Sequence, residues 1–311
     1  MSVEELLQKE REGIRVLSIQ SHVVSGHAGN KCSIFPLQLH GFEVDFINSV
    51  QFSNHGAYPY VRGQRLTEKE LGELYEGLKL NSINRYSHVL TGYCGNPTFL
   101  AKIVEIVQDL RTVNKDLLFV CDPVLGDNGE YYTPKELMEI YRDKVLPIAD
   151  VITPNAFELS ELSGQTVSNQ EECLAAISLL HQRNPNISVI VVTSGIFSDE
   201  NTKMYCYASK KLASGEIQKI RFTIPVIKGT FGGTGDVFAS LLIVWLTETN
   251  GDLRRSVSNV ISSLQKLLNR TARVAYSKSE DPSAAERELK LINGRFDLLY
   301  PNESSVEFIE L

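Results

Sequence analysis

Short strand-like segments alternate with helix-like segments along most of this chain. Ile14–Gln20 and His88–Leu90 are predicted strands, and Val189–Val192 is a predicted strand with no polar face. A strand that is apolar on both sides fits a sheet covered by helices on both faces. Because strands separated by helices usually pair in parallel, the sequence predicts an α/β fold with a central, mostly parallel sheet.

Capping residues and prolines mark the starts of several predicted helices. Thr67 and Glu70 have the spacing of a capping box, and Pro97 is expected in the first turn of the next helix. Thr133–Pro134 and Thr153–Pro154 are interpreted as the starts of two further helices, each capped by its threonine. Two antiparallel or edge strands and then two long helices are expected in the second half: Met204–Ala208, Ile220–Ile224, Asp236–Thr249 and Leu253–Ser277.

The composition is that of an acidic globular protein of ordinary polarity. The chain has 311 residues, of which 42% are hydrophobic and 22% charged, and its formal net charge is -7. A dedicated nucleic-acid-binding protein needs a basic surface, so we expect no nucleic-acid partner. No internal repeat or linker is visible, and residues 1–311 are therefore predicted to form a single domain.

We expect a cytoplasmic protein with neither a signal peptide nor a membrane span. The first ten residues are acidic and lack a long apolar stretch, and the longest apolar run, Val237–Leu246, is too short to cross a bilayer. The five cysteines are scattered and include no Cys-x-x-Cys pair, so neither a disulfide framework nor a zinc cluster is indicated. Reduced thiols in the cytosol are the simplest interpretation.

Polar segments that directly follow the predicted strands are the first candidates for a functional site. In sheets of this kind, ligands gather beyond the carboxyl ends of the strands. The segments are Ser21–His22, Asn48–Tyr58, Thr91–Tyr93, Asp122–Asp127, Thr153–Glu158 and Thr193–Ser194.

Glycines crowd the residues before the most apolar predicted helix. They are Gly229, Gly232, Gly233 and Gly235, and Asp236 follows directly. Glycine lets backbone amides turn inward, and amides at a helix start bind anions. Asp236 could therefore accept a proton from an alcohol while the amides hold a phosphate that is being transferred. A glycine turn in which Asp236 only stabilises the helix start is the alternative, and the density of glycines weakens it.

Two other nucleotide-binding patterns are missing from the sequence. The chain contains no Gly-x-x-x-x-Gly-Lys-Ser/Thr motif, and no Gly-x-Gly-x-x-Gly follows its first predicted strand. P-loop and Rossmann-type sites are thereby disfavoured.

Acids follow two of the predicted strands, and each has a second explanation. Asp122 and Asp127 lie where carboxylates suit Mg²⁺, although a Pro/Gly turn with solvated acids explains them equally well. Glu158 lies one turn into a predicted helix, where an acid simply favours the helix dipole. Thr193–Ser194 could donate hydroxyls to phosphate or end a strand.

The segment Asn48–His55 mixes polar and aromatic residues, as exposed ligand-binding loops often do. Taken alone, His55 is explained more simply as a hydrogen-bonded structural residue. Phe52 and Tyr93, taken alone, are explained more simply as packing residues.

Taken in order, these segments resemble the pyridoxal kinase family of the ribokinase superfamily. The matching stretches, from Val16 to about Asp236, are LSIQSHVVSGHAGNK, FPLQLHGFEVDFINSVQFSNH, LYEGLKLNSINRYSHVLTGY, CDPVLGDNGEYY, ADVITPNAFELSELSG, VVTS and GTGD. The resemblance implies a ribokinase-like fold and a homodimeric kinase. It also implies that the kinase uses ATP to phosphorylate the 5′-hydroxymethyl group of pyridoxal, pyridoxine and pyridoxamine.

The resemblance further implies roles for the residues around the substrate alcohol. Asp236 matches the proton acceptor of the family, and its anion hole is matched by Gly233, Thr234 and Gly235. Ser21 matches a serine that hydrogen-bonds the pyridine ring. The positions that line or cover the ring are matched by Phe52, His55, Gly56 and Tyr93.

On the nucleotide side, the resemblance implies Mg²⁺ and a monovalent cation, K⁺ or Na⁺. The cation and phosphate region is matched by Asp122, Asp127, Thr153 and Glu158. Contacts to ATP are expected from these acids and from Tyr132, Asn155, Thr193, Ser194, Ile227, Lys228, Gly229 and Thr234.

The chain departs from the family pattern at two positions beside the expected ring site. The family usually has Asn-His-Thr-Gly-Tyr, but Gly56 stands here in place of the threonine. A missing hydrogen bond costs about 0.5–1.5 kcal/mol, so we expect affinity to fall modestly. Ala28 replaces a valine and should leave a roomier wall beside the ring.

Two other functions are weighed against this one. A hydroxymethylpyrimidine kinase, from the same superfamily, has similar glycine and acid positions, and the stretch Asn48–His55 favours pyridoxal over it. A non-catalytic vitamer-binding protein that has kept the pocket is the other alternative, and the intact group around Asp236 opposes it.

Overall fold

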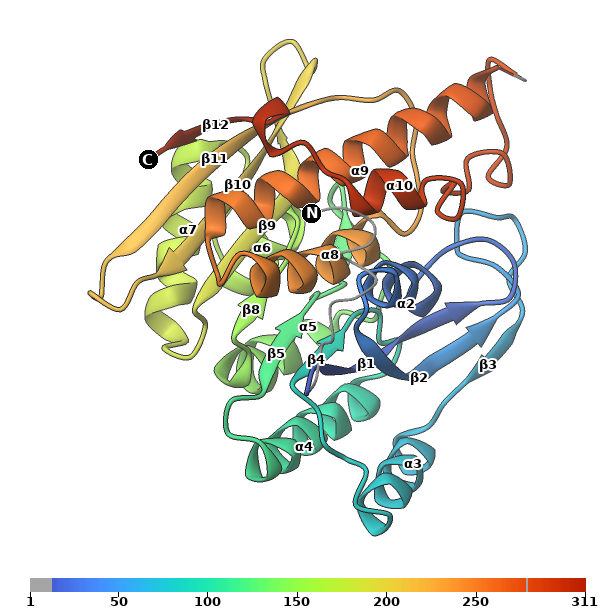
Figure 1. The fold of residues 1–311 in the computed structure, drawn as a ribbon, viewed down its shortest axis with the longest axis vertical. Helices are drawn as coiled ribbons and strands as arrows, with labels where there is room; N and C mark the ends of the chain where they lie inside the picture. Colours follow the sequence, from blue (N-terminus) through green and yellow to red (C-terminus); the bar gives the residue numbers. More distant parts are fainter. Residues whose placement is uncertain (1–12, 278) are drawn as a thin grey trace. The chain divides into compact units, whose positions relative to one another are not determined.

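The computed structural model describes residues 13–277 and 279–311 (Figure 1). These residues divide into two compact units. The first unit consists of residues 13–65 and 227–306, and the second of residues 66–226 and 307–311. The single domain expected from the sequence stays a prediction. The acidic start, residues 1–10, where we expect no signal peptide, lies outside the described residues.

Parallel strands and a buried helix form the centre of the first unit. Its elements are β1 (Arg15–Val23), α2 (Asn30–Leu39), β2 (Glu43–Phe52), β3 (Gly63–Arg65), α8 (Thr234–Glu248), α9 (Leu253–Tyr276), α10 (Arg295–Leu299) and η3 (Glu303–Ser305). β1 and β2 pair in parallel, and β3 pairs antiparallel with the end of β2. α2 packs on both β1 and β2, α8 packs on α2, and α9 packs on α8.

Helix α8 is the apolar core element of the first unit. Every residue from Val237 to Trp245 is buried, as the sequence predicted for a helix that is apolar nearly all round. α9 has one buried face, on which Val257, Val260 and Ile261 lie. The stability of α8 therefore comes from tertiary packing rather than from its ends.

In the second unit, parallel strands continue into an antiparallel meander. Its elements are α3 (Glu68–Leu80), β4 (His88–Thr91), α4 (Pro97–Val113), β5 (Leu118–Cys121), β6 (Gly126–Asp127), β7 (Glu130–Tyr131), α5 (Glu136–Ile140), η1 (Tyr141–Val145), η2 (Leu146–Ile148), β8 (Val151–Ile152), α6 (Ala156–Ser163), α7 (Gln170–Arg183), β9 (Val189–Phe197), β10 (Lys203–Lys211), β11 (Ile217–Pro225) and β12 (Glu307–Glu310). β4, β5, β8 and β9 pair in parallel in that order. β10, β11 and β12 add to β9 as antiparallel strands, which confirms the expected antiparallel segments.

Most helix starts predicted from the sequence are confirmed, and two are wrong. Thr67 and Glu70 form a complete capping box at α3, and Pro97 lies in the first turn of α4. Thr133 does not cap a helix, because its hydroxyl donates to the Leu125 carbonyl, and α5 begins only at Glu136. Thr153 does not cap α6 either.

The cysteines agree with the expectation of reduced thiols. All five are buried, and none is in a disulfide. Burial raises the pKa of the Cys121 and Cys206 thiols, which disfavours the reactive thiolate. Among the described residues, no helix combines the length and the apolar character that a bilayer crossing requires.

Candidate active site

The backbone at the start of α8 has a left-handed conformation that favours glycine. Gly233 is the N-cap residue, with φ 79° in the left-handed region and no side chain to cap the helix. A Cβ added there would lie 2.5 Å from Cys32 Sγ and 2.8 Å from the carbonyl oxygen of His27. Any larger residue would therefore be strained and would also collide with the 27–32 segment.

The amides at this helix start are available to an anion. Within the described part of the chain, the N–H groups of Gly233, Thr234 and Gly235 donate to no protein acceptor. The first turn of a helix has no intrahelical acceptor for its amides, and the helix dipole adds positive potential at the same point. This end of α8 can therefore hold a phosphate group.

Asp236 lies at the third position of α8 and turns its carboxylate toward the 26–29 turn. Its Oδ2 accepts a hydrogen bond from the Gly29 amide at 2.7 Å. Burial raises the pKa of Asp236 above its usual range, and the Gly29 hydrogen bond opposes that rise. A carboxylate with a raised pKa beside an anion-binding helix end is suited to accept a proton.

The 26–29 turn is fixed against the end of β1. Gly29 has φ 57°, and a Cβ there would lie 2.0 Å from the carbonyl oxygen of Ser21 and 2.4 Å from its Oγ. His22 and Gly29 also form an isolated bridge. Ser21, expected at the ring, is thereby brought next to the amide that contacts Asp236.

The aromatic residues expected at the ring do not all lie in a loop. Phe52 is the last residue of β2, and the guanidinium of Arg65 lies 5.0 Å from the centre of its ring. The imidazole of His55 lies against the glycine motif, since a Cβ on Gly232 would be 3.2 Å from its Cε1 and Nε2 atoms. Gly56 is exposed, and a Cβ there would meet no atom within 4 Å.

Residues expected at the adenosine lie beside the end of α9. Gly229 has φ 113°, and a Cβ there would be 2.7 Å from the hydroxyl oxygen of Tyr276. The Lys228 ammonium lies 4.9 Å from the centre of the Tyr276 ring. The sequence did not point to Tyr276, which shapes the backbone at Lys228 and Gly229.

In the second unit, the expected cation residues are gathered around the ends of β5 and β8. Asp122 is 6% exposed, and its Oδ1 accepts a hydrogen bond from Thr153 Oγ1 at 3.2 Å. The Thr153 hydroxyl thus donates to the Asp122 carboxylate, whereas the sequence predicted that it would cap α6.

Asn155 and Glu158 close the start of α6 with their own side chains. Asn155 Oδ1 accepts the Glu158 amide, and Glu158 Oε2 accepts the Asn155 amide, each at 2.9 Å. Glu158 Oε1 also accepts the Leu125 amide at 2.9 Å, and Asn155 Nδ2 donates to the Gly126 carbonyl at 2.7 Å. The α6 cap therefore holds the 125–126 segment as well as the helix.

Glu158 is a buried acid without a cationic partner. Burial raises its pKa to about 8, hydrogen bonds from backbone amides oppose the rise, and the charge of Asp127 adds to it. In the described part of the chain, no Lys or Arg lies within ion-pair distance of Glu158. Without a cation Glu158 is therefore mostly protonated at pH 7, and a cation bound beside it would lower its pKa and favour the ionised form.

Thr193 and Ser194 lie inside β9 and not after it, because β9 continues to Phe197 through its pairing with β10. The Thr193 amide donates to the Pro154 carbonyl at 3.0 Å. Gly195, with φ 97°, passes so close to Ala156 that a Cβ would be 2.7 Å from the Cβ of that alanine. The pair is thus placed beside the start of α6.

Two further residues expected at the site lie elsewhere in the second unit. Tyr132 is 62% exposed and follows the short β6–β7 hairpin, and its amide donates to the Leu125 carbonyl. Tyr93 follows β4 and is half-buried, with its hydroxyl close to Gly95.

The predicted residues therefore form two connected sets, one in each unit. The first unit joins Ser21, His55 and Asp236 through the glycine turns, and the second joins Asp122, Thr153 and Glu158 through the α6 cap. The Gly29 amide and Glu288 were missed. Gly29 lies in a stretch that matches the family and Glu288 in none, but both contacts join residues more than 200 positions apart in sequence.

The fold and the glycine-acid site define a small-molecule kinase of the ribokinase-like class, and comparisons with known proteins agree. The family described as phosphomethylpyrimidine kinase matches residues 94–280. A relative from Caenorhabditis elegans with a provisional pyridoxal kinase name is 56% identical over 306 residues, covering 95% of this chain and 93% of the relative. The pyridoxal kinase of Homo sapiens is 41% identical over 302 residues, covering 93% of this chain and 96% of that protein.

A solved structure leads to the same family. Pyridoxal kinase from Leishmania donovani, in complex with ADP and pyridoxamine, has a TM-score of 0.88 and 35% identity, covering 96% of this chain and 99% of that one. This chain belongs to the pyridoxal kinase family. The ribokinase-like α/β fold expected from the sequence is confirmed.

Proposed function

We propose that this chain is an ATP-dependent pyridoxal kinase that phosphorylates the 5′-hydroxymethyl group of pyridoxal, pyridoxine and pyridoxamine. The observation that carries the proposal is the start of α8, where three amides without a protein acceptor adjoin the Asp236 carboxylate. The relatives named above, including one in complex with ADP and pyridoxamine, support the choice of substrates.

Each part of the α8 start has its own role in the proposed reaction. The amides of Gly233, Thr234 and Gly235 stabilise the negative charge on the phosphoryl group as it moves. Asp236 accepts the proton of the alcohol as the new oxygen–phosphorus bond forms. The protein supplies mainly positioning and electrostatics, as is usual for phosphoryl transfer.

The remaining unit-one residues hold the two organic groups. Ser21 would hydrogen-bond the pyridine ring, and Phe52 and His55 would line it, together with Tyr93 of the second unit. The backbone of Ile227, Lys228 and Gly229 would contact adenosine. These assignments rest on the family resemblance. The position of His55 against Gly232 and those of Lys228 and Gly229 beside Tyr276 support it.

The second-unit acids fit Mg²⁺. Mg²⁺ is usually held by one or two carboxylates together with phosphate oxygens and water, so a dense cluster of protein ligands is not required. Indeed, among the described residues, no group of three or more His, Cys, Asp or Glu side chains could hold a metal on its own. In the described part of the chain Glu158 has no Lys or Arg partner, and a bound cation would lower its raised pKa and favour its ionised form.

In this proposal Asp122 and Thr153 would hold Mg²⁺, and Asp127 and Glu158 would add negative charge beside it once the cation is bound. Bound Mg²⁺ would offset the charge of the ATP phosphate oxygens. Asn155, Thr193, Ser194 and Tyr132 would contact ATP itself. The monovalent cation, K⁺ or Na⁺, and the homodimer rest on the family resemblance alone. Buried, unpaired cysteines support a reducing compartment such as the cytoplasm.

A coupled ADP assay with each vitamer, with and without Mg²⁺ and K⁺, tests the proposal. We expect ADP production that depends on pyridoxal and on Mg²⁺. Absence of vitamer-dependent ADP production would leave the non-catalytic vitamer-binding alternative. Hydroxymethylpyrimidine belongs in the same assay, because the matching family model is described as phosphomethylpyrimidine kinase. Faster turnover of hydroxymethylpyrimidine than of pyridoxal would favour a hydroxymethylpyrimidine kinase.

A further inference from the structure

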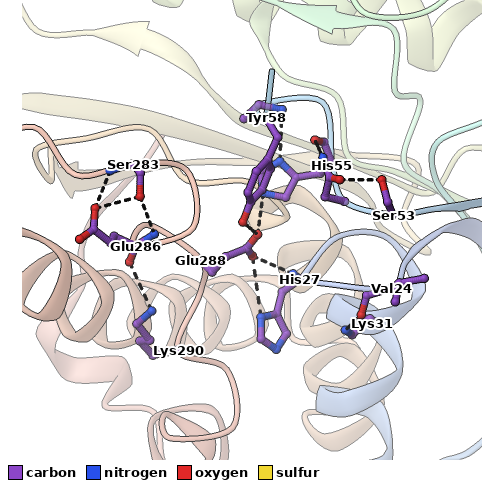
Figure 2. Close-up of polar contacts among 12 residues, drawn as sticks. Val24, His27, Lys31, Ser53, His55, Tyr58, Ser283, Glu286, Glu288 and Lys290 are labelled. Carbon is purple, nitrogen blue, oxygen red and sulfur yellow. Dashed lines mark hydrogen bonds and ion pairs between the residues drawn. The ribbon is translucent and has the colours of Figure 1, made fainter. Parts of the chain in front are cut away.

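Glu288 places a carboxylate among the loops that carry the proposed vitamer site, although it comes from a segment with no recognised motif (Figure 2). Its Oε2 accepts the His27 amide at 2.7 Å. Its Oε1 accepts the Tyr58 hydroxyl at 2.9 Å and lies 3.0 Å from His55 Nε2. One side chain therefore joins the 26–29 turn to the loop that follows β2.

The contacts of His55 define which of its nitrogens carries the proton. The Ala57 amide donates to Nδ1 at 3.3 Å, so Nδ1 is an acceptor. Nε2 then carries the hydrogen and donates it to Glu288. Both ring nitrogens of His55 are hydrogen-bonded to protein groups. His55 can therefore contact a flat ligand with the face of its ring but not through a hydrogen bond.

The same carboxylate reaches the catalytic motif by two routes. The His55 ring packs against Gly232, two residues before the first residue of α8. The His27 amide is two residues from the Gly29 amide, which donates to Asp236. Gly26 has φ 83°, and a Cβ there would lie 2.0 Å from Glu288 Oε1, so the turn is shaped around this carboxylate.

Glu288 is satisfied as an ion and is not a second base. Burial acts to raise its pKa, but hydrogen bonds from His55, the His27 amide and Tyr58 outweigh burial, and the net pKa is lowered. The pKa of Tyr58 is raised to about 12, mainly by burial and by its bond to Glu288, so Tyr58 remains a donor.

We propose that Glu288 is a positioning residue for vitamer binding and phosphoryl transfer, holding His55 as its Nε2–H tautomer and fixing the turn that presents the Gly29 amide to Asp236. This inference rests on the proposed function. It predicts that losing the carboxylate lowers kcat/KM for pyridoxal and leaves KM for ATP unchanged, since in the described part of the chain Glu288 bonds to His27, Tyr58 and His55 and to no residue assigned to the nucleotide.

The direct test compares Glu288→Gln with Glu286→Gln. Glutamine keeps the size of the side chain but places an NH₂ group where one carboxylate oxygen accepts a donor. We expect kcat/KM for pyridoxal to fall about 10- to 100-fold in Glu288→Gln, the usual effect of losing a hydrogen bond to a charged group, with KM for ATP within about twofold of wild type. Glu286 bonds to Ser283 in its own turn, and its variant should keep wild-type kinetics (Figure 2).

Two further measurements keep the test decisive. Tyr58→Phe removes the hydroxyl that donates to Glu288 and should affect folding little. We expect it to lower kcat/KM for pyridoxal, as Glu288→Gln does. ¹⁵N NMR of histidine-labelled protein without substrates should show His55 as the Nε2–H tautomer in wild type and as a tautomer mixture in Glu288→Gln. Wild-type kinetics and an unchanged His55 signal in Glu288→Gln would overturn the inference.

These readouts also separate the two proposals. If wild-type protein fails to phosphorylate pyridoxal, the proposed function is wrong, whereas the NMR signal of His55 still reports whether Glu288 sets its tautomer. If wild-type protein is active and Glu288→Gln alters neither kinetics nor tautomer, only the role of Glu288 is wrong.

Discussion

Helices α6 and α8 begin in similar ways, yet only one of them leaves its first turn open. Each has an acid at its third position, Glu158 in α6 and Asp236 in α8. In α6 the acid turns back to the N-cap residue, and Asn155 in turn accepts the acid's own amide. In α8 the N-cap residue is Gly233, and the acid turns outward to the Gly29 amide.

The difference teaches that an anion site can be made by leaving out a cap. With glycine as its N-cap residue, α8 lacks a side-chain cap, at a cost of roughly a few tenths of a kcal/mol. α8 tolerates the loss because the residues from Val237 to Trp245 are all buried. α6 has a mixed surface and uses its cap both for the helix and for the 125–126 segment.

The largest expected effect comes from replacing Asp236, the acid at the start of α8. Asp236→Asn should lower kcat about 10²- to 10⁴-fold, the range for loss of a general base, with ATP binding nearly intact. Stability should not fall. Because the pKa of Asp236 is raised in the folded protein, ionisation of this carboxyl at pH values above the pKa of unfolded aspartate lowers the free energy of unfolding. Asparagine carries no such charge. Coupled ADP assays and thermal unfolding at neutral pH check both parts. Wild-type turnover in this variant would refute the role of Asp236.

The second effect tests whether the open helix start must remain glycine. Gly233→Ala should lower kcat about 10²- to 10³-fold, because the added Cβ collides with Cys32 and His27 and displaces the amides. Gly164→Ala is the matched control, since Gly164 at the end of α6 has φ 72° and open space around it. Both variants should lose about 1–2 kcal/mol of stability from backbone strain. Equal turnover in the two variants would argue against the anion site.

The third prediction concerns the pH dependence of the proposed base, Asp236. If Asp236 is the base, kcat should fall about tenfold for each pH unit below its pKa, and the midpoint should lie above the usual value for aspartate. The direction follows because only the ionised carboxylate can accept the proton. A pH–rate profile at saturating ATP and pyridoxal measures it. A midpoint at or below the ordinary aspartate value would contradict the assignment.

A smaller effect should follow from removing the side-chain cap of α6. Asn155→Ala should cost about 0.5–2 kcal/mol of stability, and so should Asn169→Ala, which removes the N-cap side chain of α7. Only the first should also raise KM for ATP, by about 2- to 10-fold, because Asn155 holds Gly126 as well. Chemical denaturation and ATP titrations measure the two quantities. An equal KM for ATP in both variants would mean that Asn155 acts only as a cap.

The smallest expected effect concerns Gly56, in the loop whose His55 packs against Gly232 before α8. Gly56→Thr restores the residue that the family usually has, and the site has room for a Cβ. We expect KM for pyridoxal to fall about 2- to 10-fold, the value of one hydrogen bond. Gly56→Val, which has the same shape without the hydroxyl, should not reproduce the gain. If valine lowers KM equally, packing and not hydrogen bonding explains the change.

Local patterns in the sequence were enough to predict most of the fold. The capping box of Thr67 and Glu70, the proline that starts α4 and the apolar run of α8 each depend on residues close in sequence. The strand at Val189 was predicted too short, because its last residues are ordered by pairing with β10 rather than by their own hydrophobic pattern. β12 was missed for the same reason, since it is defined by pairing with β11.

The candidate site could be predicted only where a motif is continuous. Glycines followed by Asp236 predict an anion site from their spacing alone, and the family resemblance supplied Ser21 and His55. Thr153 and Asn155 lie two residues apart, and either could cap a helix, so the sequence could not show that Thr153 turns to Asp122 instead. Glu288 meets His27 and Tyr58 only in the folded chain, and no local pattern marks it.

The division of the chain into units has a consequence for its biosynthesis. Residues 13–65 leave the ribosome long before residues 227–306, although the two stretches form one unit. Until α8 is synthesised, the apolar faces of β1 and α2 lack the helix that packs on them, and such surfaces are prone to aggregate. Residues 66–226 form a nearly continuous unit that can fold earlier. The nascent amino-terminal segment is therefore the stage at which chaperones would be most needed.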